Sequence, residues 1–279
     1  MKQLNNILLS GFIILLLMPD LASAAKDETV WNTVLKQQYF SEQNIQEGDE
    51  VIEIEAPYRA EEPALVPVKI TSKIPQSNDK YIKKIMLFVD KNPYPFSGEF
   101  EFTPQSGKAD IALRIRVNTY SYIRAVAEMN DGKLYMAKKF VKASGGCSAP
   151  IGADLDAAMK RLGKMKFKLD DNIKTGKPAL TQLLISHPNI TGMQMDQVTR
   201  FIRKSHFIEK VNVTYNNKPI LTAKTDIAIS ADPNFRFYFI PEKPGILKAE
   251  ITDTSCESPN SRSVCTKGKS FSQTVKIEP

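Results

Sequence analysis

The stretch YSYIRAVAEMNDGKLYMAKKFV, residues 120–141, contains two apolar runs of strand length separated by Asn130, Asp131 and Gly132. Turn residues between runs rich in β-branched and aromatic side chains predict a pair of antiparallel strands. Similar runs precede this stretch, and we expect seven strands in the first half of the chain: residues 50–56, 64–72, 82–90, 98–103, 109–118, 120–129 and 133–141. Short strands with frequent turns favour a β-sandwich of immunoglobulin type.

The same patterning resumes in the second half of the chain after a break. The expected strands are residues 179–186, 207–215, 219–227, 235–240, 246–252 and 271–277. They predict a second, smaller sandwich. A short helix is expected before the first sandwich, at residues 29–40, with Val30, Val34 and Leu35 facing the core.

Residues 148–178 lack this pattern and are rich in Lys, Asp and Gly. We interpret them as a linker with one helix starting near Asp154. A solvated face is favoured over a membrane-surface helix, because Gly163 interrupts the basic stretch. The basic residues are Lys160, Arg161, Lys164, Lys166 and Lys168.

The fold class predicted from these patterns is all-β, with two immunoglobulin-like β-sandwich domains joined by a partly helical linker. The expected division is residues 1–24 as a signal peptide, 25–147 as the first sandwich with its Gly-Gly-Cys end, 148–178 as the linker and 179–279 as the second sandwich.

The first 24 residues have the features of an export signal. Lys2 supplies a positive start, residues 7–18 an apolar run, and Ala22, Ser23 and Ala24 a small-residue cleavage site. After these residues the sequence contains no run of about 20 apolar residues that would predict a membrane span. We therefore expect a periplasmic protein in which disulfides persist. The net charge of +7 is spread out and does not indicate a nucleic-acid partner.

Three cysteines leave one thiol unpaired in an oxidising compartment. Cys256 and Cys265 lie close together in a polar stretch between two expected strands, and we predict a disulfide between them. Cys147 would then be the free thiol. The alternative is that Cys147 pairs with one of the other two cysteines or bridges two molecules.

Cys147 follows two glycines, Gly145 and Gly146, just after an expected strand. Glycines allow a pliable backbone, so this sequence predicts a thiol on a flexible arm that can enter a partner's pocket. The alternative is that the glycines only end the strand in a turn and the cysteine is incidental.

Catalytic and cofactor motifs are missing from the sequence. It contains no dinucleotide-binding or phosphate-binding glycine loop, no Gly-x-Ser-x-Gly element and no zinc-like spacing, so we expect no cofactor, no metal and no enzyme activity. Cys147 with His187 is a formal protease pair, but a flexible arm is unsuited to a nucleophile that must meet a fixed base. For His187 itself, packing or capping is favoured over a functional role.

Several short runs resemble a known family. The first half contains IEAP (54–57), AEEPALVPV (60–68), KNP (91–93) and GGC (145–147). The second half contains SHPNITG (186–192), HFI (206–208) and DPNF (232–235). With these runs the chain resembles a fusion of the two subunits of SoxYZ, and in particular the SoxYZ-like carriers associated with quinoprotein dehydrogenases.

The resemblance implies two sandwiches packed face to face, and a carrier cysteine, Cys147, that holds sulfur intermediates covalently. Partners would be periplasmic redox enzymes, such as a quinoprotein dehydrogenase or a c-type cytochrome, and the cargo a small sulfur compound. In SoxY the cysteine lies near a free C-terminus between glycine pairs, whereas here Ser148, Ala149 and Pro150 follow it. The alternative function is a structural docking module for a dehydrogenase or cytochrome, without covalent cargo.

Overall fold

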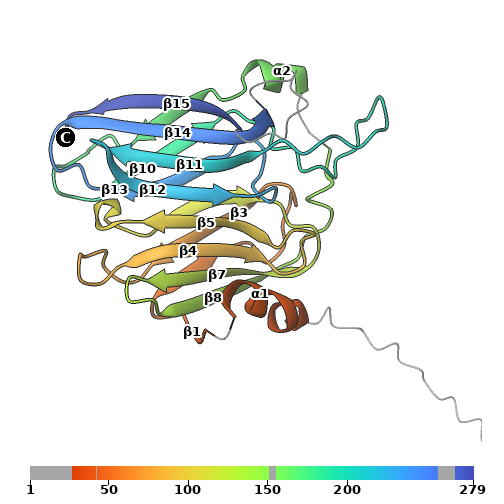
Figure 1. The fold of residues 1–279 in the computed structure, drawn as a ribbon, viewed down its shortest axis with the longest axis horizontal. Helices are drawn as coiled ribbons and strands as arrows, with labels where there is room; N and C mark the ends of the chain where they lie inside the picture. The colour runs from red at the N-terminus through yellow and green to blue at the C-terminus, as the bar shows by residue number, and fades with distance from the viewer. Residues whose placement is uncertain (1–26, 42, 151–154, 257–267) are drawn as a thin grey trace, which may run out of the picture.

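The computed structural model describes residues 27–41, 43–150, 155–256 and 268–279. Within these ranges the chain is built almost entirely of strands, which confirms the all-β fold class (Figure 1). The strands of the first half are β1 (Ile45–Glu47), β2 (Ile52–Glu55), β3 (Val66–Ser72), β4 (Ile82–Val89), β5 (Phe96–Phe102), β6 (Ile111–Ile115), β7 (Ser121–Met129) and β8 (Leu134–Val141). Those of the second half are β9 (Met165–Leu169), β10 (Ala179–Ile185), β11 (Ile208–Tyr215), β12 (Lys218–Thr225), β13 (Asn234–Phe239), β14 (Gly245–Cys256) and β15 (Gly268–Ile277).

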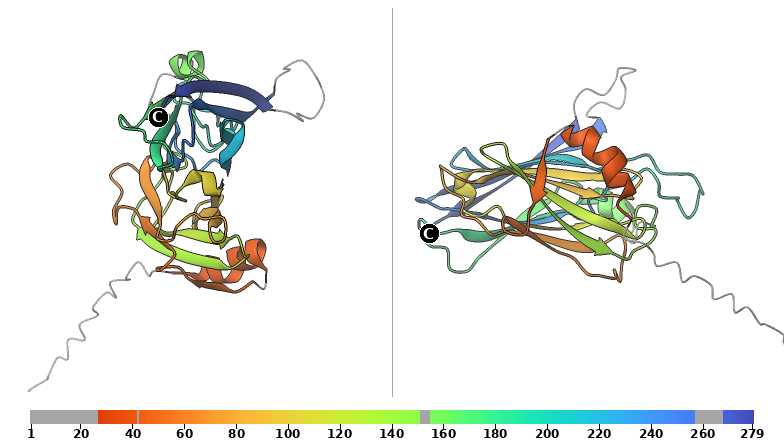
Figure 2. Two further views of the ribbon diagram at one scale, coloured as in Figure 1. Left: turned by 90° about the vertical axis from the view of Figure 1, so that its left-hand side faces the viewer. Right: turned by 90° about the horizontal axis from the view of Figure 1, so that it is seen from below.

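Two sheets form the sandwich, and both extend through both halves of the chain (Figures 1 and 2). Among the described residues, one sheet has nine strands in the order β1-β8-β7-β4-β5-β12-β11-β14-β15. The other has six, in the order β2-β3-β6-β13-β10-β9. The two halves therefore share two continuous layers.

The halves meet where β5 pairs with β12 in antiparallel register, with Phe100 opposite Ala223 and Phe102 opposite Leu221. In the smaller sheet, β6 meets β13 at Ala112. Edge-to-edge pairing corrects the expectation that the two sandwiches pack face to face. It also satisfies the backbone groups that two separate sandwiches would leave unpaired at their edge strands.

The hydrophobic core is continuous across this junction. One cluster of buried side chains includes Ile85 and Phe100 from the first half and Val211 and Phe235 from the second. The rings of Phe100 and Phe235 lie 6.3 Å apart between centroids, across both the halves and the sheets. Alternating strands such as β3 bury every second side chain against this core, as the period of two predicts.

The N-terminal helix covers the outer face of the larger sheet (Figure 2). It consists of a π-helical turn, η1 (Trp31–Leu35), followed by α1 (Lys36–Phe40). Trp31, Leu35 and Phe40 are buried against Phe88 and its neighbours. Val34, which was expected to face the core, is 49% exposed, because the wider π turn shifts the buried positions. This cover explains why β4 and β7 are buried on both faces.

The segment predicted as a linker contains a strand as well as a helix. The short helices besides η1 and α1 are η2 (Pro104–Ser106) and α2 (Leu155–Lys160), the latter close to its expected start. β9 follows α2 and pairs with β10, with Phe167 opposite Leu183. Lys166 and Lys168 alternate with buried Phe167, so they point to solvent from an edge strand.

Two predictions lie outside the described residues. The signal peptide at residues 1–24 is one, and the disulfide between Cys256 and Cys265 is the other. None of the helices in the described ranges has both the length and the apolar character needed to cross a bilayer.

We expect Phe100→Ala to destabilise both halves together. The side chain is fully buried at the β5–β12 junction, so its removal should lower the free energy of unfolding by about 3–5 kcal/mol. Urea unfolding followed by the fluorescence of Trp31 and by circular dichroism measures this loss and tests whether the two signals change together.

Phe201→Ala is the matched control, because this phenylalanine is 77% exposed and its loss should change stability by no more than about 0.5 kcal/mol. Two well-separated transitions in the unmodified protein would contradict a shared core.

Candidate functional site

The two glycines before the cysteine leave the end of β8 and run along the loop that follows β6. Gly145 N–H donates to the carbonyl of Asn118 at 2.8 Å, and Gly146 N–H to that of Val117 at 3.1 Å. Gly145 has φ of +79°, a region that favours glycine. A Cβ on Gly146 would lie 2.1 Å from the carbonyl oxygen of Pro63, so only glycine fits at this position.

The cysteine and its successors are held by side chains from both halves. Cys147 N–H donates to Asn118 Oδ1 at 3.3 Å. From the second half, Thr191 Oγ1 donates to the carbonyl of Cys147 at 2.7 Å, and Gln194 Nε2 to that of Ala149 at 3.0 Å. We call residues 145–149 the docked segment, because these contacts seat it at the junction between the halves.

Cys147 is a free thiol with only 1% of its surface exposed. This corrects the expectation of a mobile arm that projects the sulfur into solvent. The physical reason is the close approach at Gly146 together with the hydrogen bonds along the docked segment, which hold it against the sheet edges. In this conformation, which we call closed, the glycines allow the segment to pack closely against its neighbours and do not extend the cysteine into solvent.

Burial also makes the thiol unreactive. It raises the pKa of Cys147 to about 11, although the positive charge of Arg116 acts in the opposite direction. The thiolate is the nucleophilic form of cysteine. Cys147 is therefore protonated at neutral pH in this conformation.

Arg116 lies beneath the docked segment and is 3% exposed. Its Nη1 donates to the carbonyl of Gly146 at 3.2 Å, and its Nη2 to the carbonyl of Asn189 at 3.5 Å. Asn92 Nδ2 donates to the Arg116 carbonyl at 2.9 Å. The guanidinium therefore connects the docked segment with the loop at residues 187–191 of the second half.

Asn189 shapes that loop. Its φ of +41° is in the left-handed region that asparagine tolerates. The side-chain amide donates to the carbonyls of Ile229 and Ser230 at 3.2 and 3.3 Å, and its oxygen accepts from Ile208 N–H at 3.2 Å. These contacts place the Asn189 carbonyl where Arg116 reaches it.

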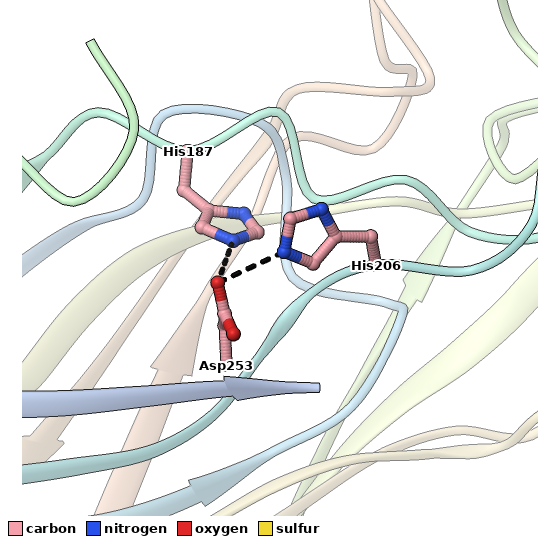
Figure 3. A group of neighbouring side chains, drawn as sticks. All are labelled: His187, His206 and Asp253. Atoms are coloured by element: carbon pink, nitrogen blue, oxygen red, sulfur yellow. Dashed lines mark hydrogen bonds and ion pairs between the residues drawn. The ribbon is translucent and has the colours of Figure 1, made fainter. Parts of the chain in front are cut away.

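Two histidines and an aspartate anchor the start of the same loop (Figure 3). His187 Nε2 lies 3.4 Å and His206 Nε2 2.8 Å from the same oxygen, Asp253 Oδ2. The two imidazole rings meet edge to face at 4.7 Å. His187 and Asp253 are buried, and His206 is partly buried.

The hydrogen bonds define the tautomer of His187. Its Nδ1 accepts a hydrogen bond from Asn189 N–H at 3.0 Å, so Nε2 carries the proton and donates to Asp253. A metal bound at Nε2 would displace this proton. In a neutral ring the proton would then move to Nδ1, which could no longer accept the hydrogen bond from Asn189 N–H. Both ring nitrogens are engaged, so His187 is not placed to act as a base for Cys147. The geometry supports the packing and capping interpretation of this histidine.

Asp253 is the member of the cluster that sequence reasoning missed. The sequence feature that could have identified it is a charged residue at an inward position of β14, two residues after buried Ile251. Burial raises the pKa of Asp253, but hydrogen bonds from His187, His206 and Ser255 outweigh this and hold it well below its usual range. Asp253 is therefore ionised and fixes both imidazoles.

Removing the hydroxyl of Thr191 should expose the thiol. We expect Thr191→Val to speed the alkylation of Cys147 by about fivefold, because one hydrogen bond to the docked segment is lost and opening becomes easier by about 1 kcal/mol. Iodoacetamide labelling of the native protein, followed by mass spectrometry of the Cys147 peptide, measures the rate.

Thr274→Val is the matched control, since Thr274 is exposed on β15 and distant in sequence from the docked segment. Equal rates in the two variants would show that Thr191 does not hold the segment closed.

His187 should titrate below a free histidine. Burial lowers the pKa of His187 below 6.5, while the hydrogen bond to Asp253 opposes the shift. The folded state binds this proton less tightly than the unfolded state. His187 therefore contributes stability that is present above pH 6.5 and is lost as the pH falls through the folded pKa.

Proton NMR follows this titration directly, because the chain has two histidines and His187→Gln assigns their signals. A midpoint at or above 6.5 for His187 would contradict the assigned environment.

Two family models match the chain in tandem. "Sulfur oxidation protein SoxY" matches residues 36–147, and "Sulphur oxidation protein SoxZ" matches residues 166–263. The matches span 112 and 98 of the 279 residues, about three quarters of the chain. The first ends at Cys147, and the second begins within β9. No curated protein matches the chain.

Solved structures with similar regions include the sulfur carrier protein SoxY from Chlorobium limicola f thiosulfatophilum, at 30% identity over 39% of this chain and 88% of that one, with a TM-score of 0.33. A superoxide reductase (neelaredoxin) from Ignicoccus hospitalis is 21% identical over 33% of this chain and 79% of that one, with a TM-score of 0.30. A putative superoxide reductase from Thermotoga maritima is 20% identical over 36% of this chain and 92% of that one, with a TM-score of 0.31.

The family models cover the motifs in both halves, and residues 145–147 of the docked segment form the end of the first match. With a SoxY domain followed by a SoxZ domain in one polypeptide, the chain belongs to the SoxYZ family of sulfur-oxidation carrier proteins.

Proposed function

We propose that the protein holds a small sulfur-containing group covalently on Cys147 and presents it to partner enzymes in the periplasm. The observation that carries this proposal is the position of Cys147. It is the last residue of the SoxY match and the one cysteine within it, and it is clamped at the contact between the two domains. The two remaining cysteines, Cys256 and Cys265, lie more than 100 residues further along the chain.

The closed conformation serves this function by protecting the thiol between transfers. Opening the docked segment breaks side-chain and loop hydrogen bonds but no strand pairing, because residues 145–149 lie outside the sheets. In water an ordinary cysteine has a pKa near 8.5, so opening lowers the pKa of Cys147 from its raised value and increases the ionised fraction. A partner that opens the segment would thereby activate Cys147.

Transfer of a sulfane sulfur to Cys147 needs no external oxidant. The Cys147 sulfur attacks the outer sulfur of a persulfide donor, R–S–SH, and a new S–S bond forms. The donor's S–S bond breaks, and the leaving thiolate takes up the proton as R–SH. Nothing in this exchange requires a catalytic base within the protein, which agrees with a carrier that depends on partner enzymes.

The partners and the compartment form part of the same proposal. The small-residue cleavage site at residues 22–24 supports export, and the resemblance to SoxYZ-like carriers supports a quinoprotein dehydrogenase or a c-type cytochrome as a partner. A docking module without cargo remains the second candidate, because a buried thiol is also what an incidental cysteine would show.

Mass spectrometry of the protein isolated from its host separates the two functions. We expect added sulfur on the Cys147 peptide, and no added mass on that peptide in Cys147→Ser, which also loses function. In vitro, glutathione persulfide should transfer one sulfur atom to Cys147, and faster in Thr191→Val because the segment opens more easily.

A Cys256→Ser/Cys265→Ser variant is the control that leaves Cys147 in place. It should still acquire the sulfur on Cys147. An unmodified thiol in protein from the host, together with full function in Cys147→Ser, would refute the carrier and favour the docking module.

A further inference from the structure

Arg116 is a buried cation that forms no ion pair with any of the described residues. Its two terminal nitrogens donate to the backbone carbonyls of Gly146 and Asn189, which carry no net charge. Its Nε is buried and has no hydrogen-bond acceptor among the described residues. Glu62 affects it only through its charge, without an ion pair. Burying an uncompensated charge is unfavourable, so such a group calls for an explanation.

A second buried arginine, Arg124, shows how this fold neutralises the charge of a buried guanidinium. Arg124 is also fully buried, but its Nε lies 2.9 Å from both oxygens of Asp90, and its Nη2 lies 2.9 Å from Glu28. Its guanidinium also stacks 4.7 Å from the ring of Trp31. Of the two arginines that are buried in the described part of the chain, Arg116 is the one that lacks such partners.

The thiol beside Arg116 does not provide the missing anion in the closed, unloaded protein. Burial keeps Cys147 protonated at neutral pH, as its pKa of about 11 shows. Arg116 would favour a negative charge on the Cys147 sulfur, and the Arg116 Nη1 contact with the carbonyl of Gly146 places the guanidinium one residue from the thiol. A cation kept here is compensated only when the sulfur carries a negative group.

We propose that Arg116 and the docked segment form an anion-binding subsite, in which the guanidinium is the counter-ion of a negatively charged group attached to Cys147. This inference rests on the proposed covalent cargo. The class of group is a sulfur or oxygen anion small enough to remain near the seated segment, such as an ionised persulfide or a sulfonate. Its terminal atom would accept from Arg116 Nε, the donor that is unpaired in the unloaded protein.

The subsite gives the carrier a way to sense its own loading. An anionic adduct neutralises Arg116 and favours the closed state, whereas a neutral or cationic adduct leaves the buried charge uncompensated or opposed. Asn189 positions Arg116 through its carbonyl, so the SoxZ domain contributes to this discrimination without touching the cargo.

Synthetic labels of defined charge test the subsite. Methanethiosulfonate reagents place a 2-sulfonatoethylthio, a methylthio or a 2-(trimethylammonio)ethylthio group on Cys147. The thiolate attacks the reagent's divalent sulfur, a new S–S bond forms, and methanesulfinate leaves with the electrons of the broken S–S bond. Tm is then measured for each labelled protein.

We expect the anionic label to give a Tm about 2–4 °C above the cationic label, as one charge-assisted hydrogen bond worth about tenfold in the folding equilibrium predicts. This difference should disappear in Arg116→Gln. It should persist in Arg114→Gln, which changes the net charge equally on the outer face of β6, two residues away.

Equal Tm values for the two labels in the unmodified protein would overturn the subsite, as would a difference that survives in Arg116→Gln or is lost equally in Arg114→Gln. Should Arg116→Gln fail to fold, the salt dependence of the Tm difference between the anionic and cationic labels in the unmodified protein tests the subsite. A difference due to a buried cation survives high salt, whereas one due to surface charge is screened and its disappearance would overturn the proposal.

The outcome is independent of the native cargo, because the labels are synthetic. An unmodified Cys147 in protein from the host refutes the proposed function, while the label experiment still reports whether Arg116 selects charge. A native adduct on Cys147 combined with no charge preference refutes the subsite alone.

Discussion

The antiparallel pairing of β5 with β12 brings together the two halves of the chain that surround Cys147. It joins two sheet edges that would otherwise face water, and it aligns Phe100 with Ala223 so that one core runs through both domains. Because the edges are locked in register, the loop at residues 187–191 is held over the docked segment. A slip of one residue would turn the buried faces of these strands outward.

Continuous sheets also explain how two domains can share a single chemical site. Thr191 and Gln194 bind backbone carbonyls of the docked segment, and Asn189 holds Arg116 beneath it. The loop that carries these groups is in turn secured by the cluster of His187, His206 and Asp253. The cysteine belongs to the SoxY domain, but two of the side-chain donors to its segment, Thr191 and Gln194, come from the SoxZ domain.

Electrostatics and burial act in opposite directions at the thiol, and burial has the larger effect. Arg116 alone would favour the thiolate, yet removal from water keeps Cys147 protonated in the closed state. The same burial leaves Arg116 without compensation, in contrast to Arg124 with its two carboxylates. In the closed protein the uncompensated positive charge of Arg116 therefore lies near the protonated thiol of Cys147.

The sequence by itself determined most of the strands, though not β1 or β9, together with the two halves and the cysteine of interest. Alternating apolar residues and turn residues are local signals, so β3, β7, β8 and β11 appeared close to their observed bounds, and the motifs around Cys147 and His187 indicated the family. β9 was missed because its alternation of Lys and apolar residues spans only five positions and follows a glycine.

Only the tertiary structure decided that the thiol is buried, that the halves join edge to edge, and that Arg116 and Asp253 lie within the site. Gly145 and Gly146 read locally as flexible, but Gly146 is required for close packing against the carbonyl of Pro63. These facts depend on contacts between residues that are distant in sequence, and the pairing of two edges has no local pattern that distinguishes one partner strand from another.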